Sequence, residues 1–423
     1  MSRRLIALLL VSFAALTACG RVSATHPATG GYRIFLEEGF NGGSERITVR
    51  DSSSGAVERQ LPLGTPAPDW SRYYTVTPVA ASARLTALDP STGRTIAQTT
   101  LPTGFTLPGL GYEGPTAGLS PNGQWLALTD NGRATTGKLV TSFMVGASSL
   151  SGSFKTLRID GDFAFDALSD TGQNLYLIQR MGDPNHYQVR LLDVRSGKLV
   201  EQPVVDKREA AEPMNGIRGD SVADPAGQYV LTVYAREAGP FIHALPLDQP
   251  FAWCIDLPAK NASDMEEQFH WSLAFNHQRS ILYAVNGSSG RIAEIYPASL
   301  PKVERTGQLA LNPAHNLLAG LVTEADAKGA RIGGAALSAD GLTLFALGNT
   351  GILVIDTASL KIRARILEGE SVDSIRLSSD GKWLYAAGAG SSKVWQINPS
   401  TGAVSGEVRG TTNPWALLWA APK

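Results

Sequence analysis

Cysteine is scarce in this chain, which has only Cys19 and Cys254 among its 423 residues. A disulfide-stapled scaffold is therefore excluded, because such domains carry many paired cysteines. An excess of charge of one sign is also missing, since 37 Lys and Arg residues against 38 Asp and Glu residues leave a net charge of −1. A nucleic-acid-binding protein should carry a basic stripe, so we expect no nucleic-acid partner.

Long hydrophobic runs are missing apart from one near the N-terminus. Residues 5–16 form an apolar stretch of 12 residues after Arg3 and Arg4. This stretch is too short to span a bilayer and is typical of a secretory signal. It ends in Leu-Thr-Ala-Cys at residues 16–19, which resembles the bacterial lipobox, whose Cys is lipidated. An ordinary cleaved signal with a chance cysteine is the alternative.

The lipobox resemblance implies a division of the N-terminal segment. Residues 1–18 would be a lipoprotein signal peptide, Cys19 the lipidation site, and residues 19–30 a flexible tether. The protein would then be extracytoplasmic and anchored through Cys19 to the cell membrane or the outer membrane. Cys254 would remain as the single thiol, and its strand-like surroundings at residues 251–256 favour an inert core position.

Recognisable catalytic motifs are missing as well. The chain has no G-x-S-x-G nucleophile elbow, no H-E-x-x-H helix and no C-x-x-C-H haem site. Residues 109–114 match G-x-G-x-x-G, but Pro115 and a strand-like run follow in place of the helix that a dinucleotide site needs. We therefore predict no cofactor, and whether the protein is an enzyme stays open, with binding favoured.

What the chain does contain is a recurring polar turn that leads into a short strand. The best copies lie at residues 119–128, 337–346 and 377–386, each with Ser-x-Asn/Asp-Gly at the turn. Five weaker copies have their turns at Gly31, Ser71, Gly172, Gly227 and Arg279. A repeat of this length is the signature of a closed or stacked array.

A second hairpin follows most of these turns, as at residues 87–97, 192–199 and 396–402. An Asp or Asn that opens the turn and a Gly that closes it are what this turn chemistry requires. Each unit is therefore about four antiparallel strands, which is one blade of an all-β propeller. Eight turns predict eight blades, with seven as the alternative. The last segment, residues 413–423, should supply the missing strand of the first blade and so close the ring.

The Ser-x-Asp-Gly-x-x-Leu-Tyr turns and the Ile-Asp-x-x-Ser/Thr-Gly hairpins resemble those of YVTN-type and quinoprotein-like propellers. The resemblance covers residues 31–423 and implies a single β-propeller domain. Its motifs specify a fold that serves both binding proteins and enzymes.

Ionisable residues recur eight to ten positions before six of the eight turns, where an innermost strand would start. They are Glu113, Asp162, Arg218, His270, Arg331 and Asp373. Clustered ionisable groups in a concavity are candidates for a functional site, so we predict a ligand site at this channel mouth. The alternative is that these residues are charged only because strand starts are exposed. Asp160, Asp162 and Asp166 could instead bind calcium through oxygen ligands.

Four long connections should lie near the same mouth: residues 103–114, 206–216, 259–269 and 312–330. Long loops on a rigid scaffold are where binding commonly resides. We therefore expect a lipid-anchored, monomeric propeller that binds an envelope protein or a small polar ligand. The alternative is a channel-mouth enzyme of lactonase or quinoprotein type, with Glu113 or His270 as general base.

Overall fold

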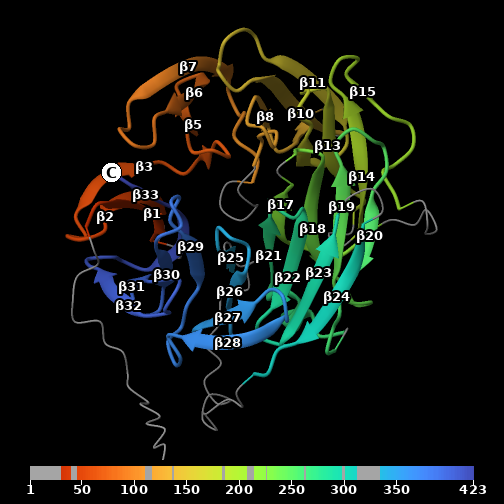
Figure 1. Cartoon of the computed structure of the whole chain (residues 1–423). Coiled ribbons are helices and arrows are strands. Elements are labelled where there is room, and N and C mark those ends of the chain that lie inside the picture. Colours follow the sequence, from red (N-terminus) through yellow and green to blue (C-terminus); the bar gives the residue numbers. More distant parts are fainter. Residues whose placement is uncertain are drawn as a thin grey trace, which may run out of the picture.

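The computed structural model describes residues 30–39, 45–109, 117–135, 138–182, 186–206, 214–224, 226–261, 263–297, 301–311 and 334–423. These residues form eight antiparallel sheets arranged in a ring (Figure 1). The prediction of an eight-bladed β-propeller is thereby confirmed, and the seven-bladed alternative is wrong. The described residues contain one helix, α1 (Met265–Gln268). None of them forms a helix of the length and apolarity that a membrane crossing needs.

The first four blades occupy the N-terminal half of the ring. Blade one contains β1 (Tyr32–Glu38), β2 (Arg46–Asp51), β3 (Val57–Leu61) and β33 (Pro414–Pro422). Blade two contains β4 (Thr65–Pro66), β5 (Tyr73–Val79), β6 (Ser82–Leu88) and β7 (Thr95–Pro102). Blade three contains β8 (Trp125–Thr129), β9 (Arg133–Thr135), β10 (Lys138–Ala147) and β11 (Lys155–Asp160). Blade four contains β12 (Phe163–Leu168), β13 (Asn174–Arg180), β14 (His186–Asp193), β15 (Lys198–Leu199) and β16 (Met214–Asn215).

The other four blades follow in chain order. Blade five contains β17 (Ile217–Ala223), β18 (Tyr229–Ala235), β19 (Phe241–Pro246) and β20 (Trp253–Asp256). Blade six contains β21 (Trp271–Asn276), β22 (Ile281–Asn286), β23 (Arg291–Tyr296) and β24 (Lys302–Gln308). Blade seven contains β25 (Ala335–Leu337), β26 (Thr343–Leu347), β27 (Ile352–Asp356) and β28 (Lys361–Ile366). Blade eight contains β29 (Ser374–Leu377), β30 (Leu384–Gly388), β31 (Lys393–Ile397) and β32 (Val404–Val408).

The polar turns of the sequence join the innermost strand of a blade to its second strand. In blade seven, the hydroxyl of Ser338 donates to Oδ1 of Asp340 at 2.6 Å and accepts a bond from the amide of Thr343 at 2.9 Å. Gly341 has a φ of 70°, a left-handed conformation that glycine adopts without strain. Equivalent side-chain bonds start at Ser120, Ser169 and Ser378. We call this end of the ring the turn face and the opposite end, where the innermost strands start, the start face.

The second hairpins join the third strand to the outermost one through an aspartate or asparagine. In blade two, Oδ1 of Asp89 accepts bonds from the amides of Ser91 at 2.8 Å and Thr92 at 3.1 Å. The hydroxyl of Ser91 also donates to this oxygen, and mainly for that reason the pKa of Asp89 falls to about 2. The same turn recurs at Asp51, Asp193, Asp356 and Asn398.

The C-terminal strand closes the ring, as the sequence predicts. β33 pairs antiparallel with β1, with Leu417 opposite Leu36. On the blade-two side of this pair, the ring of Trp419 stacks on Trp70 at 4.8 Å and lies 5.2 Å from Phe35. The first blade is therefore built from both ends of the described chain, and the edge of β1 is covered.

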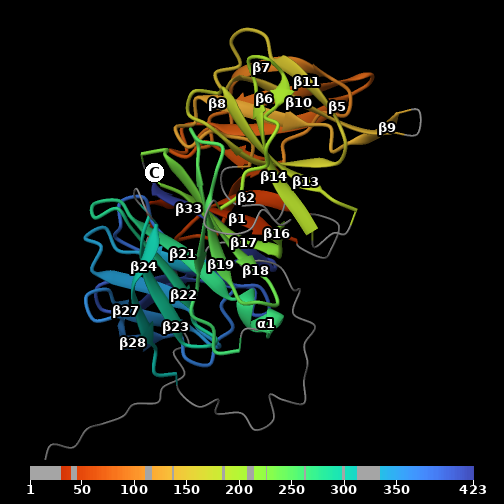
Figure 2. The ribbon, with the colours of Figure 1, turned by 90° about the vertical axis from the view of Figure 1, so that its right-hand side faces the viewer.

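The core lies between the blades and not within any one of them. Each cluster of buried apolar side chains joins two adjacent sheets, as where Tyr283 of blade six packs with Leu344 of blade seven. The outermost strands alternate between covered and exposed residues, as in β24. This is the pattern of a sheet that is covered on one face. Figure 2 shows the ring from the side, with the outer strands of blade six crossing its surface.

Candidate functional site

Four of the six predicted channel-mouth residues lie in the described parts of the chain. Asp162 immediately precedes β12, His270 precedes β21 and Asp373 precedes β29, while Arg218 is the second residue of β17. All four therefore stand at the start face. Glu113 and Arg331 lie outside the described residues, as do Cys19 and the rest of the N-terminal segment up to residue 29.

Two of these residues form ion pairs with neighbouring side chains. Asp162 pairs with Arg180 of the same blade at 3.0 Å, and the side chains are 34% and 50% exposed, respectively. Arg218 lies 3.8 Å from Asp166 of blade four, whose side chain is only 2% exposed. Among the described residues, no group of three or more His, Cys, Asp or Glu side chains is arranged to hold a metal ion. Of the three aspartates that could bind calcium, Asp162 and Asp166 each face an arginine. Asp160 lies at the end of the outer strand β11.

The other two residues contact the hairpins of their own blades. The carboxylate of Asp373 accepts a hydrogen bond from the backbone amide of Ala389 at 2.7 Å. Nδ1 of His270 contacts the hydroxyl of Ser288, which follows β22. Among the described residues of the start face, the His270–Ser288 contact is the one arrangement that resembles a base beside a nucleophile.

A cavity of about 400 Å³ lies at the opposite end of the channel, on the turn face. Its walls come from the innermost strands of four consecutive blades, β17, β21, β25 and β29, which Figure 1 shows facing the centre of the ring. The lining residues are 273–278, 335–339 and 376–377, together with Val222 and Gly341. The lining is mostly apolar, and it contains no Asp or Glu side chain.

Arg376 is the only Arg or Lys residue in this lining. It lies on β29, half-buried, and its Nε donates to the carbonyl of Leu417 on the next innermost strand at 3.2 Å. Among the described residues, no other hydrogen bond and no ion pair is recorded for its guanidinium. Burial lowers the pKa of Arg376 from its ordinary value, but an arginine remains charged under any physiological condition.

Asn276 also lines the cavity and carries a buried donor. Its side chain is 2% exposed, and Oδ1 accepts bonds from the amides of Gln278 and Arg279, both at 3.1 Å. Nδ2 has no hydrogen-bond partner among the described residues. The amide lies against Gly341, where a Cβ atom would come within 2.3 Å of Nδ2. The turn glycine therefore also makes room for this amide.

Asp220 is the acidic group whose charge acts on Arg376, and it raises the pKa of Arg376 against the effect of burial. It belongs to a bulge of β17, where the pairing register shifts between Arg218 and Ser221. Bulges redirect side chains, and here Oδ2 accepts from the amide of Leu273 at 2.8 Å and Oδ1 from that of Ser221 at 2.9 Å. Burial raises the pKa of Asp220 to about 6. At pH 7 this carboxyl is still mostly ionised, and it loses its charge as the pH falls below about 6.

Arg376, Asn276 and Asp220 were not predicted from the sequence. The predicted site residues lie at the starts of the innermost strands, whereas Arg376 stands two positions before the turn serine Ser378. A charged residue two positions before a Ser-x-Asp-Gly turn was the available signal. Asn276 replaces the turn serine itself in blade six, and this difference was also visible.

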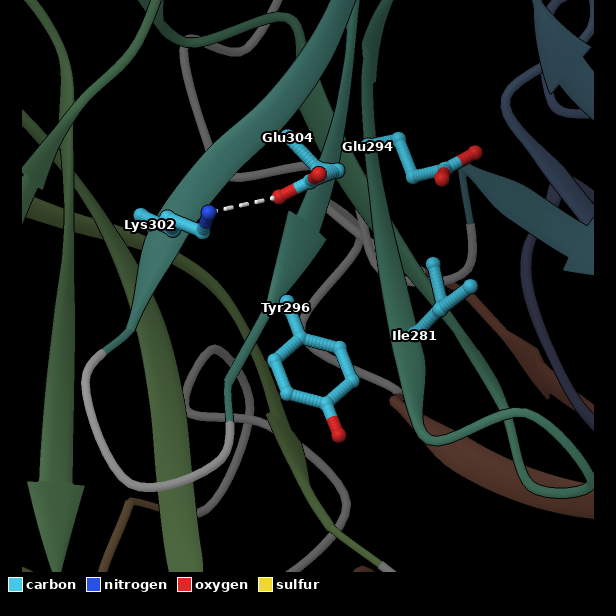
Figure 3. A pocket seen from close by; sticks show the side chains of 5 residues that line it. All are labelled: Ile281, Glu294, Tyr296, Lys302 and Glu304. Atoms are coloured by element: carbon cyan, nitrogen blue, oxygen red, sulfur yellow. Dashed lines mark ion pairs between the residues drawn. The ribbon is translucent and has the colours of Figure 1, made fainter.

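A second hollow, of about 410 Å³, lies on the outer strands of blade six (Figure 3). Lys302 pairs with Glu304 at 3.0 Å on β24, and Tyr296 beside them is 44% exposed. The carboxylate of Glu294 is buried and paired with Arg305. Because its charged groups bind one another, this hollow on blade six is a weaker candidate for a ligand site than the channel cavity.

Comparison with solved structures places the fold among known propellers. Apo AztD from Citrobacter koseri matches with a TM-score of 0.52 at 11% identity, over 93% of this chain and 98% of that one. Dihydro-heme d1 dehydrogenase NirN, in complex with DHE, matches with a TM-score of 0.51 at 14% identity, over 93% and 79%. The periplasmic gluconolactonase PpgL of Pseudomonas aeruginosa matches with a TM-score of 0.44 at 17% identity, over 85% and 98%. No family model and no curated protein matches the chain. What the chain shares with AztD and NirN is therefore the propeller fold.

Proposed function

We propose that this protein is a ligand-binding propeller that takes a small polar molecule into the turn-face cavity of its channel. The observation that carries the proposal is the cavity itself, of about 400 Å³ and built from four consecutive blades. Small-molecule sites commonly have this size and combine an apolar lining with a few placed polar groups. Arg376 and the amide of Asn276 are such groups.

The arrangement of the cavity favours binding over catalysis. Ser338 is the one hydroxyl in the lining, and it donates to Asp340 within its own turn. The carboxylate of Asp340 is a poor base, because its hydrogen bonds lower its pKa, so the hydroxyl is not activated as a nucleophile must be. Asp220 is held by two backbone amides and does not line the cavity.

A ligand screen that uses a blocking variant tests this proposal. The full-length protein in mild detergent is melted with sugars, organic acids, lactones, nucleotides and calcium. A ligand at 100 times its dissociation constant should stabilise the fold by about 2.7 kcal/mol. Ala339→Trp should abolish the shift, because Ala339 is an exposed lining residue at the cavity rim. Leu342→Trp, in the same exposed turn but outside the lining, should leave it intact. A shift that survives Ala339→Trp would place the ligand elsewhere.

The proposal includes the lipid anchor that the lipobox resemblance implies. Attachment through Cys19 would hold the propeller at an envelope membrane, where an envelope protein could also bind it. Membrane fractions from cells that express the wild type and Cys19→Ser test this part. The wild type should sediment with membranes and the variant should be released, whereas equal release of both would contradict the anchor.

The second candidate function is a hydrolase at the start face, which the His270–Ser288 contact favours. In this arrangement His270 would act as base and Ser288 as nucleophile toward a lactone or ester. The test is to measure the hydrolysis of simple lactones and aryl esters by the wild type and by the variants His270→Ala and Ser288→Ala. Activity that both variants lose would support the hydrolase, and activity that survives in both would exclude these residues.

A further inference from the structure

The channel cavity has a fixed guanidinium with donors to spare. Arginine has five N–H donors, and at Arg376 one of them, on Nε, is bonded to the carbonyl of Leu417. That bond ties β29 to β33 and fixes the orientation of the planar group. The terminal nitrogens are therefore presented in a defined direction, and a planar carboxylate can accept two parallel bonds from such a group.

Asp220, the acid whose charge acts on Arg376, does not bind the terminal nitrogens of that guanidinium. Both oxygens of Asp220 accept bonds from backbone amides, those of Ser221 and Leu273. No ion pair between Asp220 and Arg376 is recorded among the described residues. An incoming carboxylate would therefore meet a guanidinium without a bound counter-ion.

The second donor points to an oxygen acceptor as well. Because Oδ1 of Asn276 accepts from two backbone amides, its Nδ2 can act only as a donor. A buried donor without a partner is costly unless a bound molecule supplies the acceptor. Arg376 and Asn276 are thus both hydrogen-bond donors, and an oxygen acceptor on the ligand would suit each of them.

The remaining walls of the cavity are apolar and favour a hydrocarbon part of the ligand. Leu273 and Phe275 are buried, and Ala335, Leu337 and Leu377 continue the apolar surface. Without an acidic side chain in the lining, nothing there compensates a ligand cation. An apolar body with one anionic end matches Arg376, the amide of Asn276 and the apolar walls.

We infer that the ligand of this cavity is a small organic acid, with its carboxylate on Arg376, an oxygen near Asn276 and an apolar body against Leu273 and Phe275. This inference rests on the proposed function, because it names the ligand class of the same cavity. Benzoate and phenylacetate are suitable probes, and benzamide and phenylacetamide are their uncharged counterparts.

The test is calorimetric titration of the full-length protein with these four probes at constant ionic strength. The carboxylates should bind, and the amides should bind at least 10-fold more weakly. Arg376→Gln should weaken benzoate binding by about 10- to 100-fold, because a hydrogen-bonded charge is lost. Arg409→Gln, an exposed arginine outside the cavity, should change nothing.

A second variant keeps the test decisive if Arg376→Gln does not fold. Asn276→Asp retains the acceptor for Gln278 and Arg279 but places a negative charge beside the ligand. It should therefore weaken the carboxylates much more than the amides, which lose only the Nδ2 donor. Probes that bind equally well with and without the carboxylate, and lose affinity in Ala339→Trp, would overturn the ligand class while supporting the cavity. Failure of all four probes to bind would overturn the inference together with the proposed site.

Discussion

At the scale of single residues, buried carboxyl groups set how the stability of this protein responds to pH. Glu37 on β1 is 5% exposed, and its Oε1 has no hydrogen-bond partner among the described residues. Burial, with a smaller contribution from Glu45, raises the pKa of Glu37 from 4.5 to about 7. Below pH 4.5 the group is neutral in both the folded and the unfolded chain. Between pH 4.5 and 7 only the unfolded chain loses this proton, so the contribution of Glu37 to stability falls as the pH rises.

The variant Glu37→Gln should remove this dependence, because its side chain stays neutral at every pH. We expect the variant to melt at a higher temperature than the wild type above pH 7, and the difference to shrink toward pH 4.5. Melting curves between pH 4 and 8 measure it. Glu304→Gln is the control, since Glu304 is about half exposed and its ion pair with Lys302 contributes little. Parallel pH curves for the wild type and Glu37→Gln would contradict the prediction.

At the scale of the elements, the polar turns are stabilised by side chains and not only by the backbone. Oδ1 of Asp340 accepts from the hydroxyl of Ser338 and from the amide of Leu342 at 3.0 Å. These bonds lower the pKa of Asp340, the one from Ser338 most of all. The turn thereby fixes the register between β25, which forms part of the cavity wall, and β26.

Asp340→Ala should therefore destabilise the fold by about 1 kcal/mol at pH 7, the usual contribution of such a bond at an exposed site. The loss should shrink as the pH is lowered, since the wild-type carboxylate becomes protonated and accepts more weakly. Denaturant titration at two pH values measures both effects. Leu342→Ala in the same turn is 54% exposed and should cost less than about 0.5 kcal/mol. Equal effects of the two substitutions would show that the side-chain bonds contribute nothing.

At the scale of the whole molecule, stability depends on how the ring is closed. Leu417 lies on the closing strand β33, is fully buried and packs with residues of blades one and eight. Ring closure joins residues that are far apart in the chain, so the loss of packing there affects the whole propeller.

Leu417→Ala should cost about 2–5 kcal/mol, as expected for a large-to-small change in a packed core. Because every blade packs on two others, we expect one cooperative transition that moves to lower denaturant concentration. Fluorescence and circular dichroism should report the same midpoint. A first transition confined to one probe, with the rest of the fold unchanged, would mean that blade one opens independently.

Much of this architecture could be predicted from the sequence because its signals are local. The Ser-x-Asp-Gly turns and the Asp-x-x-x-Gly hairpins are held by bonds between residues two to five positions apart, so their residues reveal them directly. Seven inner turns lie where the repeat predicts them, and the eighth predicted turn, at Gly31, directly precedes β1 of blade one. The helix α1 and the small hairpin between β9 and β10 were not predicted, because neither belongs to the repeat.

By itself, then, the sequence determined the turns, the strands, the number of blades and the pairing of the last strand with the first. Only the tertiary structure decided where a cavity lies and which side chains meet in it. Val222, Asn276 and Arg376 come from three blades, and no local pattern relates them. Whether the guanidinium of Arg376 is left with open donors depends on bonds made by Leu417 and Asp220, which only the closed ring brings close.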